Sequence, residues 1–220
     1  MYILNASFGS ILLIVGAVLL IIYHETPVML LRELPILHRF TGAAGVIIIC
    51  FMMSTNVISA PSVSLENKNL WISRSLPIHS GKMLLSKAAC HFVVTLPAVL
   101  IGAASYIIAV PVSLIDAVAT IVAPTVFTAF CALVGVTVNL QFPKSDYINE
   151  TAVIKQSPSV IISMLVNIGA LLIPVGIYIF TAALIPSFVF MLLFSLMLAA
   201  VCVLLCRYLT HGGADRLESL

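Results

Sequence analysis

The sequence is poor in charge. Only 8% of its 220 residues are Asp, Glu, Lys or Arg, against about 25% in an ordinary soluble domain. No polar stretch is long enough to fold alone, and a net charge of +2 gives no reason to expect nucleic acid as a partner. The mean hydropathy of +1.22 predicts an all-α, polytopic membrane protein, with residues 1–220 forming a single transmembrane domain in the lipid bilayer.

The apolar spans also contain almost no ionisable side chains, and the two to note are Asp116 and His91. Both lie near span ends, and we expect them to reach the interface. A charge at mid-bilayer costs at least ~2.5–3.5 kcal/mol and usually marks an ion path or a proton relay. The scarcity of such charges argues against a proton- or sodium-coupled transporter and against a cation channel lined by acidic rings.

Enzyme signatures are missing as well. The sequence has no H-E-x-x-H motif, no pair of glutamates inside a span and no P-loop. An intramembrane enzyme therefore has little support, and the sequence predicts no catalytic residue, no cofactor site and no metal site. If the chain moves a solute uphill, the energy must come from a partner.

Five cysteines are an odd number, and their spacings match no zinc pattern. We expect free thiols, with Cys202 and Cys206 as packing residues on one helix face. The N-terminus has no positive n-region, so a cleaved signal peptide is not expected.

Six segments reach the length of about 20 apolar residues that a membrane-crossing helix needs. They lie near residues 3–23, 42–60, 88–110, 114–140, 158–180 and 184–208. The very short turns at 111–113 and 181–183 predict two tight hairpins, one of spans three and four and one of spans five and six. Alternating ten-residue segments typical of a membrane β-barrel are absent.

Positive charge sets the orientation of such a bundle. The segments 61–87, 141–157 and 209–220, with the adjoining end of span six, hold eight of the ten cations: Lys68, Arg74, Lys82, Lys87, Lys144, Lys155, Arg207 and Arg216. The opposite side holds Arg32 and Arg39. This bias predicts that those three segments and both termini are cytoplasmic and that the chain is a multi-pass protein of the cell membrane.

The loop His24–Phe40 is half apolar. Val28, Leu31 and Leu34 share a helical face, Pro27 suits a first helical turn, and Pro35 would end the helix. An amphipathic helix in the outer interface fits this pattern, and a re-entrant extracellular gate is the alternative.

The first polar segment, Val63–Lys87, contains four of the ten cations and one acid, Glu66. Ser64 is a good N-cap, Glu66 would lie in the first turn, and Pro77 would stop the helix. The pattern predicts a short cytoplasmic helix over residues 65–76.

The apolar side chains of this helix fall on two opposed faces at 100° per residue: Leu65, Ile72 and Leu76 on one, and Leu70 and Trp71, flanking Arg74, on the other. We expect one face to rest on the bundle and the other to dock a protein. The alternative is that Trp71 anchors at the lipid interface. Beyond the proline, Ser80 is expected to cap a second helix that runs through Lys87 into span three.

The second polar segment, Gln141–Ser157, follows span four. Its notable residues are Phe142, Pro143, Lys144, Asp146, Glu150 and Lys155. Pro143 would break the end of span four, and Asp146 or Glu150 is expected to pair with a basic group of the first segment for at most about 1 kcal/mol.

These two segments resemble a known family. Residues 64–71, SLENKNLW, followed by SLPI at 75–78, are similar to the S-L-E-G-K-N-L-W and S-L-P-I stretches of ABC-2-type permeases of a bacterial ABC exporter family. The residues Asn139–Glu150, NLQFPKSDYINE, and Ile154–Ser157, IKQS, are similar to the L-N-L-x-F-P-K-x-D-W-x-N-E and V-K-Q-S stretches of that family. The chain departs at Asn67, where glycine is usual, and at Tyr147, where tryptophan is usual.

The resemblance covers roughly residue 46 to the C-terminus. It implies a membrane-spanning permease subunit of an ATP-driven exporter, in which separate cytoplasmic ABC-type ATPase subunits bind and hydrolyse ATP. Members of that family are longer, so the chain would correspond to the C-terminal half of a permease or to a half-size subunit that joins a second half or forms a homodimer. A coupling-type cytoplasmic helix would rest on the ATPase.

The predicted ATPase-coupling residues are Leu65, Glu66, Lys68, Asn69, Leu70, Trp71 and Arg74. The alternative function is a membrane scaffold or assembly factor that docks a cytoplasmic protein through the same helix without transport.

Overall fold

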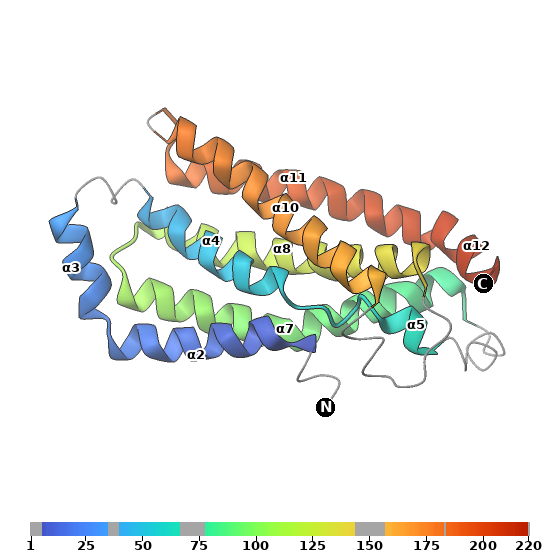
Figure 1. Cartoon of the computed structure of the whole chain (residues 1–220). Coiled ribbons are helices and arrows are strands. Elements are labelled where there is room, and N and C mark those ends of the chain that lie inside the picture. Colours follow the sequence, from blue (N-terminus) through green and yellow to red (C-terminus); the bar gives the residue numbers. More distant parts are fainter. Residues whose placement is uncertain (1–5, 35–39, 67–77, 144–156, 183, 220) are drawn as a thin grey trace.

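The computed structural model describes residues 6–34, 40–66, 78–143, 157–182 and 184–219, and every regular element in these ranges is a helix. The helices, labelled as in Figure 1, are α2 (Phe8–Ile22), α3 (Glu25–Glu33), α4 (Thr41–Ser54), α5 (Ser62–Glu66), α7 (Ser80–Ala109), α8 (Leu114–Gln141), α10 (Pro158–Thr181), α11 (Ser187–Thr210) and α12 (Gly212–Ser219). The predicted all-α class is confirmed.

In the part of the chain that the structure describes, four helices are long and apolar enough to cross a membrane: α7, α8, α10 and α11, with 24 to 30 residues each. They coincide with the last four predicted segments to within a few residues, except that α7 begins at Ser80 instead of 88. The predicted continuation of one helix through Lys87 into span three is therefore confirmed. Its cap differs from the prediction, because His79 Nδ1 accepts the Gly81 N–H at 3.1 Å, so Ser80 is already helical.

The first predicted span, 3–23, coincides with α2 over the residues that the structure describes. The 15-residue α2 is followed by α3 at an angle of 74°, so the pair is either one bent span or a re-entrant loop. A helix within the loop His24–Phe40 is confirmed over Glu25–Glu33, and none of its residues is buried. Both readings of that loop agree with this geometry.

The second predicted span, 42–60, is wrong as a single helix, since α4 ends at Ser54. The hydroxyls of Ser54 and Thr55 donate to the carbonyls of Phe51 and Met52, at 2.7 and 2.8 Å. Such side chains compete with the helical hydrogen-bond ladder. With 14 residues, α4 is too short to cross about 30 Å of hydrocarbon alone.

The chain between α4 and α5 is irregular, and most of it is buried in protein. Asn56 is 1% exposed, and its amide group accepts from Ser10 N at 3.1 Å and donates to Ser10 Oγ at 3.0 Å. The Val57 N–H donates to the Ala6 carbonyl at 2.9 Å. Non-helical backbone at membrane depth is tolerated where protein rather than lipid surrounds it.

Helix α8 is the centre of the bundle and packs against α4, α7, α10 and α11. The Phe127 ring is fully buried and lies 6.1 to 6.2 Å from the rings of Phe130 and Phe194. The predicted hairpin of spans three and four is confirmed, with Val110–Ser113 as its turn. Ser113 begins α8 by accepting the Asp116 N–H at 3.2 Å and donating to the Asp116 carboxylate at 2.7 Å.

The predicted tight hairpin of spans five and six is only partly correct. Tyr178 and Phe190 stack next to the turn, with ring centroids 4.3 Å apart. Away from the turn the two helices separate (Figure 1), and each packs on α8 and α4. The apolar faces of α10 and α11 are therefore buried against the central helices more than against each other.

The five cysteines are free thiols, as expected, and they differ in exposure. Cys50 and Cys131 are at most 1% exposed, whereas Cys90 is exposed on α7. We expect N-ethylmaleimide to modify Cys90 of the native protein in mild detergent well before Cys50 and Cys131, because close packing excludes the reagent from the core. Mass spectrometry of the modified peptides over time measures this order, and equal rates at the three positions in folded protein would contradict the packing described here.

Candidate functional site

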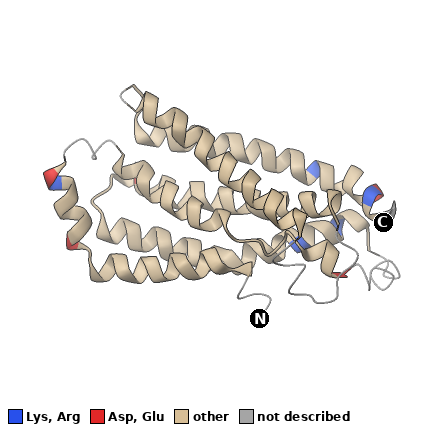
Figure 2. Ribbon diagram, viewed as in Figure 1, with Lys and Arg blue, Asp and Glu red and all other residues tan. Residues whose placement is uncertain are grey.

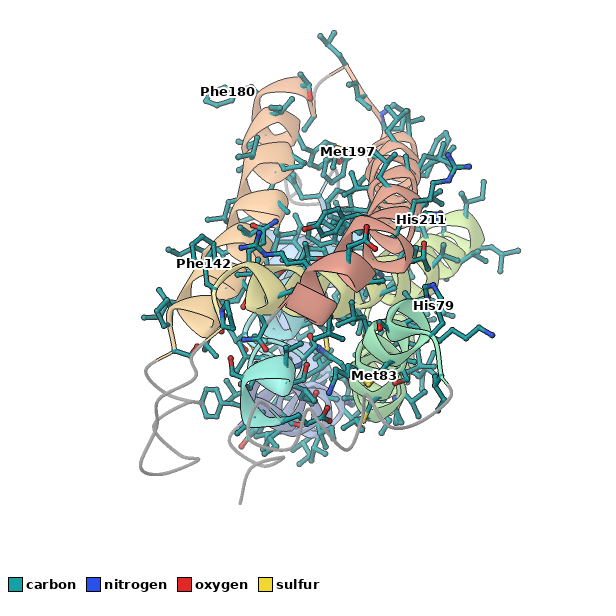
Figure 3. All side chains as sticks on the ribbon, turned by 90° about the vertical axis from the view of Figure 1, so that its right-hand side faces the viewer. His79, Met83, Phe142, Phe180, Met197 and His211 are labelled. Atoms are coloured by element: carbon teal, nitrogen blue, oxygen red, sulfur yellow. The ribbon has the colours of Figure 1, made fainter. Side chains whose placement is uncertain are left out.

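The described cations divide between the two ends of the bundle as the sequence predicted. Lys82, Lys87, Arg207 and Arg216 lie at the end that holds α5 and α12, and Arg32 lies on α3 at the other end (Figure 2). Figure 3 looks onto the α5 and α12 end, where His79 just before α7 and His211 just after α11 mark neighbouring helix ends. This end also holds the described parts of both polar segments.

Asn139, in the last turn of α8, joins the first polar segment to the bundle. Its side-chain oxygen accepts the backbone N–H groups of Val63 and Ser64, at 2.7 and 3.0 Å, and its amide nitrogen donates to Ser64 Oγ at 2.7 Å. Asn139 and Ser64 are both fully buried. The first N–H groups of a helix have no partner within it, so Asn139 acts as a cap for α5 from another helix.

The same amide reaches the start of α10. Asn139 Nδ2 donates to Ser159 Oγ at 3.0 Å, Ser159 Oγ donates to the Ala60 carbonyl at 3.1 Å, and Ser157 Oγ lies 2.7 Å from Ser159 Oγ. Neither serine is exposed. We call this group, Asn139 with Ala60, Val63, Ser64, Ser157 and Ser159, the Asn139 cluster. It links α5, α8 and α10 by direct hydrogen bonds.

Two details of the predicted short helix are corrected. Helix α5 begins at Ser62, so Ser64 lies inside it instead of capping it. Glu66 lies one turn beyond the start of α5 and is therefore not a first-turn acid, while most of the predicted helix over 65–76 lies outside the described residues. The physical reason is tertiary: Asn139 supplies the cap, and the buried Ser64 hydroxyl is turned toward that amide.

The carboxylate of Glu66 forms an ion pair with Lys87 of α7. The Lys87 side chain is only 9% exposed and also lies 3.4 Å from the Ser62 carbonyl, whereas Glu66 is 46% exposed. A shallow groove of about 300 Å³ lies between α5 and α7 and is lined by Ile58, Ser62, Leu65, Glu66, Ser86, Lys87 and Cys90. Glu66 and Lys87 both belong to the first polar segment, so this ion pair joins the two ends of that segment.

Only four predicted site residues are described. Leu65 and Glu66 lie on α5, Phe142 follows α8 with its side chain 48% exposed, and Pro143 comes directly after it, as predicted for the end of span four. The others lie outside the described residues, as does the predicted pairing of Asp146 or Glu150: Lys68, Asn69, Leu70, Trp71, Arg74, Lys144, Asp146, Glu150 and Lys155.

An apolar cluster packs beneath α5 at this end of the bundle. Val63 of α5 packs with Leu84 of α7, Leu140 of α8, and Leu209 and Leu217 of the C-terminal region, each at most 2% exposed. The side chain of Arg216 donates to the Leu140 carbonyl at 3.3 Å, which satisfies a carbonyl in the last turn of α8. Helix α5 is thus held by both apolar packing and hydrogen bonds.

The sequence did not predict the contact between Ser59 and His91, and His91 was expected at the membrane interface. Instead, His91 is 1% exposed, and its Nδ1 lies 2.8 Å from Ser59 Oγ. Ser59 is pressed against Gly135 of α8, where a Cβ would overlap its hydroxyl, so the pair is tightly packed on that side. No acid is paired with His91 among the described residues, and the contact fastens the irregular segment to α7.

The described residues contain no group of three His, Cys, Asp or Glu side chains that could hold a metal ion. What the site offers chemically is a rigid, capped helix end beside an ion pair and a groove. Of the residues missed by sequence reasoning, Asn139 had a usable signal, since an amide near the end of an apolar helix demands a buried partner.

A comparison with protein-family models, with curated proteins and with solved structures finds no match to this chain.

Proposed function

We propose that the chain is the membrane-spanning permease subunit of an ATP-driven, ABC-type exporter, with ATP bound and hydrolysed by separate cytoplasmic ATPase subunits. The proposed family rests on the resemblance of the two polar segments to ABC-2-type permeases. One contact supports it independently of that resemblance: Ser64, near the start of the first segment, is hydrogen-bonded to Asn139, 75 residues away in the last turn of α8 and two residues before the second segment. The described starts of the two segments, which a common partner would have to reach together, therefore lie close to each other.

The Asn139 cluster also supports a mechanical role. Helix α5 is bonded to the end of α8 and, through Ser159, to the start of α10, while Glu66 is paired with α7. A displacement of α5 would act on three long helices at once, because buried hydrogen bonds and close packing transmit strain instead of absorbing it. This is what a coupling helix driven by an ATPase needs.

The proposed topology has six crossings, with both termini in the cytoplasm of the cell. In it, α2 with α3 makes the first crossing and α4 with the buried segment after it makes the second. The excess of cations at the α5 and α12 end supports this orientation. The partner at the membrane would be the ATPase pair, together with a second permease half or a second copy of the chain.

The decisive experiment is co-purification of the detergent-solubilised chain with a neighbouring gene product that carries Walker motifs. We expect such an ATPase to bind, and the double substitution Leu70→Ala and Trp71→Ala to reduce the bound ATPase about tenfold, the effect of 1.4 kcal/mol at an aromatic hot spot. The amount of folded chain in the membrane should stay unchanged.

A matched control removes an aromatic residue and a leucine at the opposite end of the bundle. Phe180→Ala with Leu184→Ala changes side chains that are 89% and 85% exposed and should leave ATPase binding intact. If the wild-type chain never binds an ATPase but captures a cytoplasmic protein without Walker motifs, the scaffold reading replaces the permease. Equal loss of folded protein on mutating the first segment would mean that Trp71 serves as a lipid anchor.

A further inference from the structure

A second site lies at the other end of the bundle, between α2, α4 and α7. There the structure contains a cavity of about 410 Å³, which we call the α2–α4 slot. Its volume falls within the range of ~300–1,000 Å³ that small-molecule pockets occupy. Helix α3 closes its far end through Pro27, Leu30 and Leu31.

The shape of the slot follows from where α2 and α4 touch. They meet at Gly9, where a Cβ would overlap the Met52 carbonyl, and Ser10 is bonded to Asn56 just after the end of α4. Toward α3 the two helices separate (Figure 1), and the slot lies between them. The floor is α7, where Ser105 and Tyr106 are buried at 2% and 8% exposure.

The slot opens toward the lipid. Leu12 of α2, Leu30 of α3 and Ile48 of α4 line it and are 39 to 52% exposed, so its rim is an apolar surface on the outside of the bundle. Gly16 also lines it, and a Cβ added there would meet no atom within 4 Å. The slot is therefore open beside Gly16, and no neighbouring helix packs against this residue.

The two buried polar side chains of the lining, Ser105 and Tyr106, both have hydrogen-bond partners. The Ser105 hydroxyl donates to the Gly102 carbonyl at 2.8 Å, and the Tyr106 hydroxyl donates to the Thr41 carbonyl. None of the described buried polar atoms without a partner belongs to the lining. Water needs two to four polar partners to stay in a cavity, so the slot disfavours water and polar ligands alike.

We infer that the α2–α4 slot binds one hydrocarbon chain of a bilayer phospholipid. A cavity with nothing in it forfeits the dispersion contacts of its walls, and acyl chains are the solvent that surrounds an apolar rim in a membrane. The chain enters between α2 and α4 and lies over Ser105 and Tyr106, with α3 covering its end. This inference needs only a membrane environment and does not depend on transport activity.

The test is photolabelling in phosphatidylcholine vesicles that contain a small fraction of phosphatidylcholine with a diazirine in one acyl chain. Ser105 and Tyr106 are buried, so annular lipid cannot label them, whereas a chain inside the slot can. We expect label on these two residues by tandem mass spectrometry. Gly16→Leu fills the slot and should reduce that label about tenfold, the change that 1.4 kcal/mol produces.

Gly169→Leu is the matched control, since a Cβ there also meets nothing within 4 Å but lies on α10, away from the slot. It should leave the label on Ser105 and Tyr106 unchanged. Ala44→Leu, from the facing wall, replaces Gly16→Leu if that variant does not fold by circular dichroism. Two results would overturn the inference: no label on Ser105 and Tyr106 in the wild-type protein, or label that persists there in the filled variants. The first result is also expected if another part of the chain occupies the slot.

Discussion

Asn139→Leu is expected to lower the free energy of unfolding by about 2–4 kcal/mol. The substitution removes the acceptor of two buried backbone N–H groups, those of Val63 and Ser64, and the donor to two buried serine hydroxyls. A buried group left without a partner costs about 1–3 kcal/mol, and loss of an ordinary N-cap costs about 0.5–2 kcal/mol. Side-chain hydrogen bonds within membranes average only about 0.6 kcal/mol, so the backbone donors should dominate the loss.

Denaturant titration in mixed micelles, followed by circular dichroism, measures this change. Gln141→Leu is the matched control. It replaces a polar amide by leucine two residues further along α8, at a position that is exposed. It should shift the unfolding free energy by less than about 0.5 kcal/mol. If Asn139→Leu were as stable as Gln141→Leu, the Asn139 cluster would not hold α5.

Gly9→Ala is expected to destabilise the protein by about 1–3 kcal/mol, at the upper end of overpacking effects if the backbone cannot move. A Cβ at position 9 would overlap the backbone carbonyl of Met52 and the hydroxyl of Thr55. A backbone carbonyl cannot turn away as a flexible side chain can. Relief requires α2 to move off α4, and that movement would break the hydrogen bonds between Ser10 and Asn56.

The control lies on the same helix. Gly16→Ala adds the same methyl group two turns away, where nothing lies within 4 Å, and should leave stability unchanged or raise it by up to about 1 kcal/mol through reduced backbone freedom. Thermal unfolding of the two variants side by side in one detergent measures the difference. Equal midpoints for Gly9→Ala and Gly16→Ala would contradict the close crossing of α2 and α4.

The local sequence pattern was sufficient to predict the long helices. Residues 114–140 are predominantly apolar and are bounded by Ser113 and Pro143, and the structure forms α8 over Leu114–Gln141. The predicted span 42–60 failed because its second half contains Asn56 and Ser59, whose side chains bind Ser10 and His91. Hydropathy averages over such residues, so it could not register that the helix stops at Ser54.

The sequence could predict where the polar segments lie in the chain, but not which contacts hold their described parts. The polar segments indicated where a partner could bind, and four of their highlighted residues, including Leu65 and Phe142, lie at the charged end of the bundle. The contacts of Asn139 with Val63 and Ser159 join residues 76 and 20 positions apart. No spacing rule within one helix relates such pairs.

By itself, the sequence determined the helical class, the membrane environment and the division of positive charge between two ends, because these depend on composition and on local periodicity. Tertiary structure alone decided that α5 is capped by Asn139, that His91 is buried against Ser59, and that α2 and α4 separate into an apolar slot. The physical reason is that a buried polar group takes its partner from whatever helix packs nearest, and a cavity exists only where two helices diverge. Both depend on distances between residues far apart in the chain.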